Sequence, residues 1–174
     1  SIIYLREKYP KLKIIEGDFL KLDFSTVFQG KFSIIGNFPY NISNPILFKV
    51  YENSTNIVQV VGMFQKEVAE RITAKPGNKT YGILSVLLNL FYNIEYLFTV
   101  HEHVFTPPPK VKSAVIRLTK NDKIYPELDI PLFTKVVKAG FNQRRKTLRN
   151  ALHLFKEYYH NINPEFLSKR AEQL

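Results

Sequence analysis

Apolar residues recur along this chain in short runs that alternate between the spacing of strands and the spacing of helices. Helical spacing at residues 45–51, 66–73 and 81–92 predicts three helices, the first with Asn44 as N-cap and Pro45 as first helical residue. Strands that alternate with helices indicate an α/β fold with a mostly parallel sheet, in which the last two strands form an antiparallel edge. The expected strands are residues 13–16, 32–36 (fully buried), 57–64, 94–100 and 113–119.

The pattern changes near Asn121. Beyond it we find no strand pattern, and helices are predicted at residues 132–141, 147–159 and 164–168. We therefore expect two domains, an α/β domain at 1–120 and a small, truncated helical domain at 121–174. The chain starts inside a predicted helix and stops at the start of another, which favours a fragment of a longer protein.

The composition indicates a basic protein with a core. Of 174 residues, 45% are hydrophobic, and 25 Lys and Arg against 15 Asp and Glu give a net charge of +10. This charge favours a nucleic acid partner, although a basic protein without such a partner has the same balance. The absence of cysteine excludes disulfides and is compatible with the expected cytoplasmic location. No apolar run is long enough for a membrane span, and no acidic cluster near His101 and His103 supports a metal site.

The tetrad Asn37-Phe38-Pro39-Tyr40 directly follows the apolar run 32–36. It places a side-chain amide, backbone carbonyls and an aromatic ring at the carboxyl end of a strand, where open α/β sheets bind their ligands. The oxygens can accept hydrogen bonds from an exocyclic amino group, and the ring can stack on a base. The pattern favours a site for chemistry on a base nitrogen; a proline turn with a structural asparagine is the alternative.

Three further groups of residues carry candidate chemistry. Asp18 follows a predicted strand and a glycine, so its carboxylate either accepts from a ligand's amino group or forms an Asx turn. Phe105 precedes a rigid run of prolines at 107–109, where it is either a base-stacking ring or a core residue. The segment 135–156 has seven cationic residues and no acid, which suits either phosphate contacts or a solvated helix face.

Together, these motifs resemble the ribosomal RNA adenine N6-dimethyltransferases of the KsgA type. The family usually has leucine in place of Phe38, a mild departure because it uses the backbone of that residue. The resemblance implies an incomplete Rossmann-like methyltransferase sheet, a helical RNA-binding domain at 121–174, and S-adenosylmethionine as methyl donor. The matching pieces, in the family's order, are residues 16–18, 37–43, 65–72, 81–86, 105–114, 141–152 and 170–172.

The resemblance also assigns catalytic roles. The Asn37 side-chain oxygen and the Phe38 carbonyl would accept hydrogen bonds from the two N–H groups of an adenine amino group. These hydrogen bonds would make the lone pair of the nitrogen available. Tyr40, which follows Pro39, and Phe105 would stack on the two faces of the extruded adenine. Alignment and acceptors that favour the developing ammonium would then supply most of the acceleration.

Cofactor binding is the weak point of this assignment. Asp18 matches the residue that holds the cofactor's adenine amino group, and Asn37 borders the same ligand. The family's glycine-rich loop and ribose-binding acid lie upstream of its equivalent of Ser1. We therefore expect the chain as given to bind S-adenosylmethionine weakly and to be inactive. The family's neighbours of strand 13–16 lie upstream as well, so we expect this strand to be displaced, swapped or supported by other residues.

The expected activity is dimethylation of N6 of two adjacent adenines in small-subunit ribosomal RNA during ribosome assembly. The expected partner is an immature small subunit, which Arg144, Arg145, Lys146 and Arg149 contact through phosphates. A large-subunit rRNA methyltransferase of the antibiotic-resistance type is one alternative, although residues 141–152 resemble the first group more closely. A non-catalytic RNA-binding or ribosome assembly factor is the other.

Overall fold

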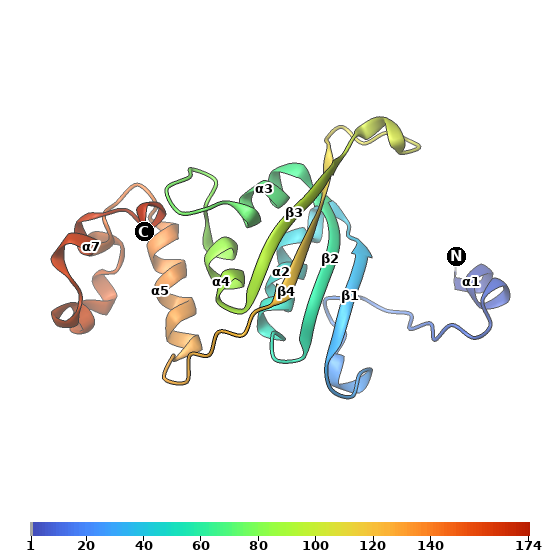
Figure 1. Ribbon diagram of the computed structural model, residues 1–174, viewed down its shortest axis with the longest axis horizontal. Coiled ribbons are helices and arrows are strands. Elements are labelled where there is room, and N and C mark those ends of the chain that lie inside the picture. Colours follow the sequence, from blue (N-terminus) through green and yellow to red (C-terminus); the bar gives the residue numbers. More distant parts are fainter. Residues whose placement is uncertain (1) are drawn as a thin grey trace. The chain divides into compact units, whose positions relative to one another are not determined.

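The computed structural model describes residues 2–174, which fall into two compact units that meet in sequence at Gly30 and Lys31 (Figure 1). The first unit contains α1 (Ile2–Lys8) and a 3₁₀ helix at Phe24–Thr26, where Phe24 is buried. Residues 13–16 form no strand, so that prediction is wrong. A lone strand is not stable, and the described residues of this unit, 2–30, form no other strand whose backbone could pair with it. Ser1 lies outside the described residues.

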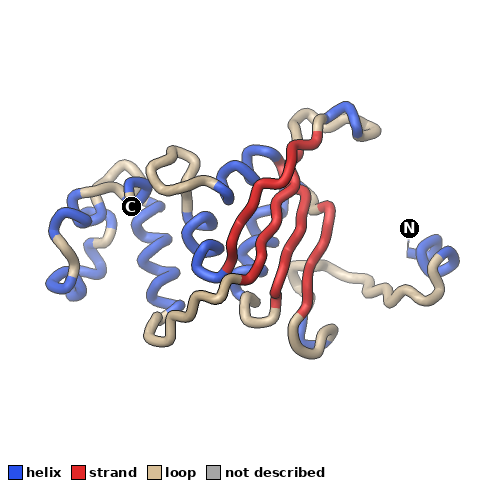
Figure 2. Tube along the Cα trace, in the orientation of Figure 1, coloured by secondary structure: helices blue, strands red, loops and turns tan. Residues whose placement is uncertain are grey.

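The second unit is built on a four-stranded sheet in the order β1-β2-β4-β3 (Figure 2). β1 and β2 are parallel, whereas β4 runs antiparallel to both β2 and β3. The α/β class and the antiparallel pairing of the last two strands are as predicted. The sheet is mixed rather than mostly parallel, because β4 enters between β2 and β3 and forms antiparallel pairs with both. The strands are β1 (Phe32–Asn37), β2 (Ile57–Gln65), β3 (Tyr92–Val100) and β4 (Ser113–Lys120).

Three helices cover one face of this sheet: α2 (Ser43–Glu52), α3 (Lys66–Thr73) and α4 (Ile83–Phe91) (Figure 1). Their apolar residues and the inward-facing residues of β2 and β4 form the core, and the Tyr92 hydroxyl donates to the Ile57 carbonyl at 3.0 Å. The largest fully buried side chains are Tyr92, Phe64, Ile46, Leu47, Ile57, Ile72, Leu87, Leu88, Ile116, Leu118, Val50 and Val60.

Two local expectations for this region are wrong. β1 is not fully buried: its residues alternate between half-buried and exposed, and Ile35 is 86% exposed. The reason is that α2, α3 and α4 cover one face of the sheet, so side chains of β1 that point to the other face are exposed. The edge position of β1, next to β2 alone, leaves the side chains on its covered face only half-buried. Asn44 is not the N-cap of α2, because a 3₁₀ turn at Tyr40–Ile42 leads directly into a helix that already begins at Ser43.

After β4 the described residues contain helices and loops but no strand. The helices are α5 (Ile130–Asn142), α6 (Leu148–Ala151), a 3₁₀ helix (His153–Asn161), α7 (Pro164–Ser168) and a 3₁₀ turn (Ala171–Gln173). The predicted single helix at 147–159 is therefore wrong. The Phe155 N–H donates to the Leu152 carbonyl, only three residues back, at 2.8 Å, which is a 3₁₀ and not an α-helical hydrogen bond. The Arg149 carbonyl accepts instead from the Tyr159 hydroxyl at 2.8 Å. The domain boundary expected at Asn121 stays a prediction.

Candidate active site and nucleic-acid interface

A cavity of about 330 Å³ lies at the carboxyl end of β1. This end of the strand and the loop between β3 and β4 lie at the same edge of the sheet (Figure 2). The structure thus brings together all five residues predicted to be catalytic, although they come from segments more than 60 positions apart. The cavity is lined by Asn37, Phe38, Pro39, Tyr40, Phe105, Pro107 and Pro109.

The Phe38 side chain anchors the tetrad to the core. Its ring is 8% exposed and stacks on Phe64, with ring centroids 5.1 Å apart. It also lies over Gly62 of β2, where a Cβ would come within 2.5 Å of the Phe38 ring. The backbone of Phe38 is tied to β2 as well, because its N–H donates to the Met63 carbonyl at 3.3 Å. A buried ring leaves the backbone as the part of Phe38 that can serve a ligand.

Tyr40 is half-buried and is held at two points. Its carbonyl accepts from the Ser43 hydroxyl at 3.0 Å, and its own hydroxyl shares a hydrogen bond with the hydroxyl of Ser113, which is fully buried at the start of β4. Sequence reasoning missed Ser113, whose sole signal was its place at the end of the family motif 105–114. Asn37, by contrast, is an exposed residue of the cavity lining.

Asp18 lies in the first unit, after the irregular segment that replaces the expected strand. Its Oδ1 accepts from the backbone N–H of Leu20 at 2.8 Å, which is the Asx-turn geometry considered as its alternative role. A carboxylate has about four acceptor positions, so one turn hydrogen bond is compatible with a ligand contact. The role of Asp18 in holding a cofactor stays a prediction.

A second cavity, of about 580 Å³, is strongly basic. Among its lining residues are three fixed cations and no acid, so its interior attracts anions. Two of the four predicted RNA contacts, Lys146 and Arg149, line it, whereas Arg145 is exposed elsewhere. Lys156 belongs to the cationic segment 135–156 that was considered for phosphate contacts. The remaining lining residues were missed, although positions 146, 149, 153 and 156 recur at helical spacing. The lining is Lys146, Arg149, Asn150, His153, Lys156 and Tyr159.

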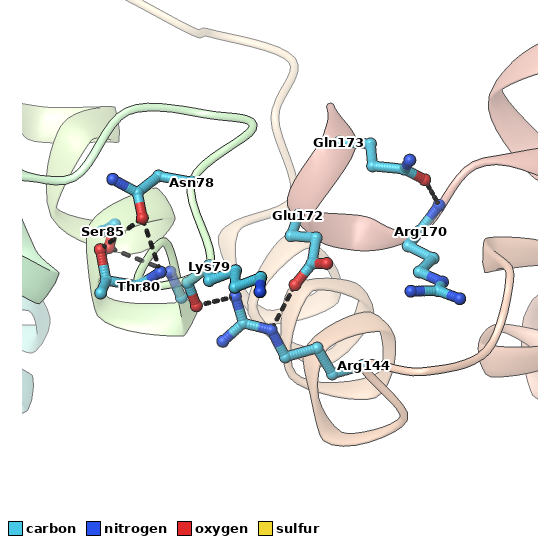
Figure 3. A network of polar contacts seen from close by, with 9 residues as sticks. Asn78, Lys79, Thr80, Ser85, Arg144, Arg170, Glu172 and Gln173 are labelled. Atoms are coloured by element: carbon cyan, nitrogen blue, oxygen red, sulfur yellow. Dashed lines mark hydrogen bonds and ion pairs between the residues drawn. The ribbon is translucent and has the colours of Figure 1, made fainter.

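Arg144, the remaining predicted RNA contact, belongs to a network of internal contacts (Figure 3). Its guanidinium pairs with the Glu172 carboxylate and donates to the Lys79 carbonyl. The Glu172 carbonyl in turn accepts from the Gly77 N–H at 2.7 Å. We call these contacts the clamp, since they tie the loop between α3 and α4 to the C-terminal turn. A phosphate contact by Arg144 stays a prediction and would compete with the ion pair.

No group of three or more His, Cys, Asp or Glu among residues 2–174 is placed to hold a metal ion. His101 and His103 are exposed, and their rings stack on each other with centroids 5.5 Å apart. None of the helices in the described part of the chain is long and apolar enough to cross a bilayer.

The sheet, its helical layer and the cavity at its carboxyl edge define a Rossmann-like methyltransferase fold. The sequence identifies the group more closely, because residues 4–170 match the family model described as ribosomal RNA adenine dimethylase. The chain belongs to this family of methyltransferases, which confirms both the resemblance and the predicted class of fold.

Relatives and solved structures agree with this assignment. "Ribosomal RNA small subunit methyltransferase A" of Cytophaga hutchinsonii is 61% identical over 176 residues, which cover 100% of this chain and 68% of that protein. The protein of the same name from Bacteroides thetaiotaomicron is 61% identical over 155 residues, or 87% of this chain and 58% of that protein. The chain therefore spans about three fifths to two thirds of the length of these relatives.

Two solved structures share the fold. A dimethyladenosine transferase from Plasmodium falciparum has a TM-score of 0.78 and 28% identity, and covers 99% of this chain and 71% of its own. The 23S rRNA methyltransferase ErmE has a TM-score of 0.69 over 98% of this chain and 73% of its own, and at 23% identity it shows a common fold alone.

Proposed function

We propose that this chain carries the substrate half of an S-adenosylmethionine-dependent methyltransferase that dimethylates N6 of two adjacent adenines in small-subunit ribosomal RNA. The observation that carries the proposal is the cavity in which the exposed Asn37 amide lies beside Tyr40 and Phe105. Family membership and the names of the bacterial relatives support the substrate.

The chemistry asked of the chain is to make a weak nucleophile reactive. The lone pair of adenine's amino nitrogen is delocalised into the ring. The Asn37 Oδ1 and the Phe38 carbonyl accept hydrogen bonds from the two N–H groups of this nitrogen. These hydrogen bonds draw the nitrogen toward a tetrahedral form and localise its lone pair. Because these acceptors bind a developing ammonium more strongly than a neutral amine, they stabilise the transition state selectively. The methylated nitrogen would release one proton to solvent and keep one N–H, so the same site could run a second transfer.

The cavity walls hold the base in place. Tyr40 and Phe105 stack on the two faces of the extruded adenine, and stacking on an aromatic ring contributes about 1–3 kcal/mol per base. Extrusion is required because a stacked, paired base hides its amino nitrogen from a transfer reaction. The proline loop that follows Phe105 limits the conformations open to this wall.

S-adenosylmethionine, when bound, supplies an electron-poor methyl group attached to a sulfonium. Asn37 suits a position beside it because its carboxamide is exposed and offers both an acceptor and donors. Asp18 is the proposed partner of the cofactor's adenine amino group. No G-x-G pattern occurs in the chain, so the chain alone is expected to bind the cofactor weakly, and isothermal titration with micromolar affinity would contradict this.

The second, basic cavity is proposed to bind RNA that lies outside the reacting base. Lys146, Arg149 and Lys156 line it and Arg145 is exposed nearby in sequence, so all four suit phosphate contacts on an immature small subunit. Such contacts position the RNA and are independent of base sequence.

A chimera provides the decisive test. Residues 1–174 replace the matching segment of the longer Cytophaga hutchinsonii relative, and methyl transfer to unmethylated small subunits is followed by mass spectrometry of dimethyladenine. Asn37→Ala is expected to lower kcat by about 100-fold or more, the usual cost of losing one transition-state hydrogen bond. Asn93→Ala, an exposed asparagine of β3, is the matched control and should leave kcat unchanged.

The outcomes separate the candidate functions. Methylation at the normal rate by Asn37→Ala contradicts the catalytic assignment. A chimera that binds small-subunit RNA but transfers no methyl group supports a non-catalytic assembly factor. Preference for protein-free large-subunit RNA over isolated small subunits supports the resistance-type enzyme.

A further inference from the structure

A hydrogen bond joins two parts of the cavity that lie far apart in the sequence. The hydroxyl of Tyr40, in the turn after β1, meets the hydroxyl of Ser113, the first residue of β4. Ser113 is 0% exposed, whereas Tyr40 is half-buried and borders the cavity. A buried hydroxyl that lost its partner would be costly, so this contact is a defined feature of the site.

Ser113 offers a rigid point of attachment. In the sheet it pairs with Gln65 of β2 and Val100 of β3, so both neighbouring strands fix its backbone. The residue before it, Lys112, is fixed as well, because its carbonyl accepts from the Lys66 N–H at 2.9 Å. A hydroxyl on such a frame has little freedom to follow a moving partner.

Tyr40 is consequently held at both ends. The Ser43 hydroxyl binds its carbonyl at 3.0 Å, and Ser113 binds the far end of its ring. The position of the hydroxyl fixes the first side-chain torsion of Tyr40. Because a phenolic O–H lies in the plane of its ring, the direction of the hydrogen bond to Ser113 also favours one plane for the ring. Ring plane is the property that stacking on a base requires, since the energy depends on face-to-face overlap.

Ser113 also ends the loop that carries Phe105. The loop leaves β3 at Val100 and re-enters the sheet at Ser113. The same hydrogen bond therefore links the loop that carries Phe105, the proposed second wall of the cavity, to Tyr40, the proposed first wall. We propose that Ser113 is a positioning residue that sets the Tyr40 ring against the extruded adenine, an inference that rests on the proposed function.

The first test observes the ring without any reaction. The chain is labelled with 3-fluorotyrosine, and the Tyr40 fluorine signal is assigned from its loss in Tyr40→Phe. Ser113→Ala is expected to shift and broaden this signal as the ring gains alternative orientations. Ser85→Ala is the matched control: Ser85 is also 0% exposed, donates to the Arg71 carbonyl at 2.6 Å and accepts from the Gly82 N–H at 3.1 Å. It should leave the signal in place.

The second test uses the chimera described above. Ser113→Ala and Tyr40→Phe are each expected to lower kcat by about 5- to 10-fold, the equivalent of one hydrogen bond, with KM changed less than about 2-fold. KM is spared because phosphate contacts outside the cavity dominate RNA affinity. The double variant should be no slower than either single variant, since both remove the same contact.

The results discriminate clearly. An unchanged Tyr40 signal in Ser113→Ala, a kcat equal to that of Ser85→Ala, or additive losses in the double variant would each overturn the positioning role. A wild-type chimera that fails to methylate any rRNA overturns the proposed function and the catalytic meaning of this contact with it. A loss confined to the Ser113 and Tyr40 variants supports the proposal.

Discussion

The position of the tetrad depends on a glycine in the neighbouring strand. A Cβ at Gly62 would lie 2.5 Å from Cε2 of Phe38 and 2.7 Å from Cε2 of Phe64. Phe64 is 0% exposed and Phe38 is 8% exposed, so neither ring can swing out without opening the core. Gly62→Ala must therefore displace Phe38, whose carbonyl is a proposed acceptor in the reaction.

The size of the effect follows from the overlap. Overpacking a well-packed core costs about 1–3 kcal/mol. At about 2–4 °C per kcal/mol for a domain of this length, the melting temperature should fall by about 2–12 °C. Phe38→Leu removes ring atoms from the crowded space, so it should cost less in the Gly62→Ala background than in the wild type. We expect a favourable coupling of about 0.5–3 kcal/mol in the double-mutant cycle.

Urea unfolding followed by circular dichroism measures these differences in the free energy of unfolding. Substitutions at two other glycines, where a Cβ would meet less or no crowding, provide comparisons. At Gly36 a Cβ would lie 3.0 Å from the Phe38 ring, so Gly36→Ala should destabilise less than Gly62→Ala. Gly17 has nothing within 4 Å, so Gly17→Ala should stay within about 0.5 kcal/mol of wild type. A Gly62→Ala variant as stable as the wild type, or one that Phe38→Leu fails to relieve, would refute the reasoning.

Three further predictions concern the rest of the molecule. Lys156→Ala should lower the slope of log affinity against log salt for small-subunit RNA by about 0.7–0.9, the value of one phosphate contact, whereas Lys135→Ala should leave it unchanged. Glu172→Gln should weaken the clamp by about 1–3 kcal/mol and speed hydrogen exchange at the loop amide that donates to its carbonyl. A hydrogen bond from Arg117 lowers the pKa of Glu95 below its ordinary value of 4.5. This contribution to stability is therefore present above pH 4.5 and lost as pH falls through the lowered pKa, so the melting temperatures of wild type and Glu95→Gln should converge in acid and separate at neutral pH.

The elements of the core were predictable because their local pattern agrees with their burial. The helix at 66–73 and the strand that begins at Ile57 appear where the apolar spacing places them. Strand order was not predictable, since no local pattern in β4 says that it enters between β2 and β3. The burial of β1 was overestimated because an apolar run indicates β structure but does not show whether both faces of the strand are covered.

The cavity was predictable from the family motifs, while the contacts that support it were not. The tetrad and Phe105 each carry a recognisable pattern. Ser113 carries no pattern beyond its place near the end of the motif 105–114, because a serine gains its role from the residue it contacts across 73 positions of sequence. Arg144 shows what a local pattern leaves out. A cation in a basic run suggests a phosphate contact, which stays a prediction, but the run does not reveal the ion pair of Arg144 with Glu172, 28 residues away.

The structure also explains why phenylalanine can stand where the family usually has leucine. The side chain at position 38 points into the core and is matched there by a glycine on β2 and by Phe64. The proposed chemistry uses the carbonyl of the same residue, which any side chain leaves in place. Substitution at this position is thus constrained by volume rather than by reactivity. Asn37, whose side chain is exposed and makes the proposed contact itself, has no such freedom.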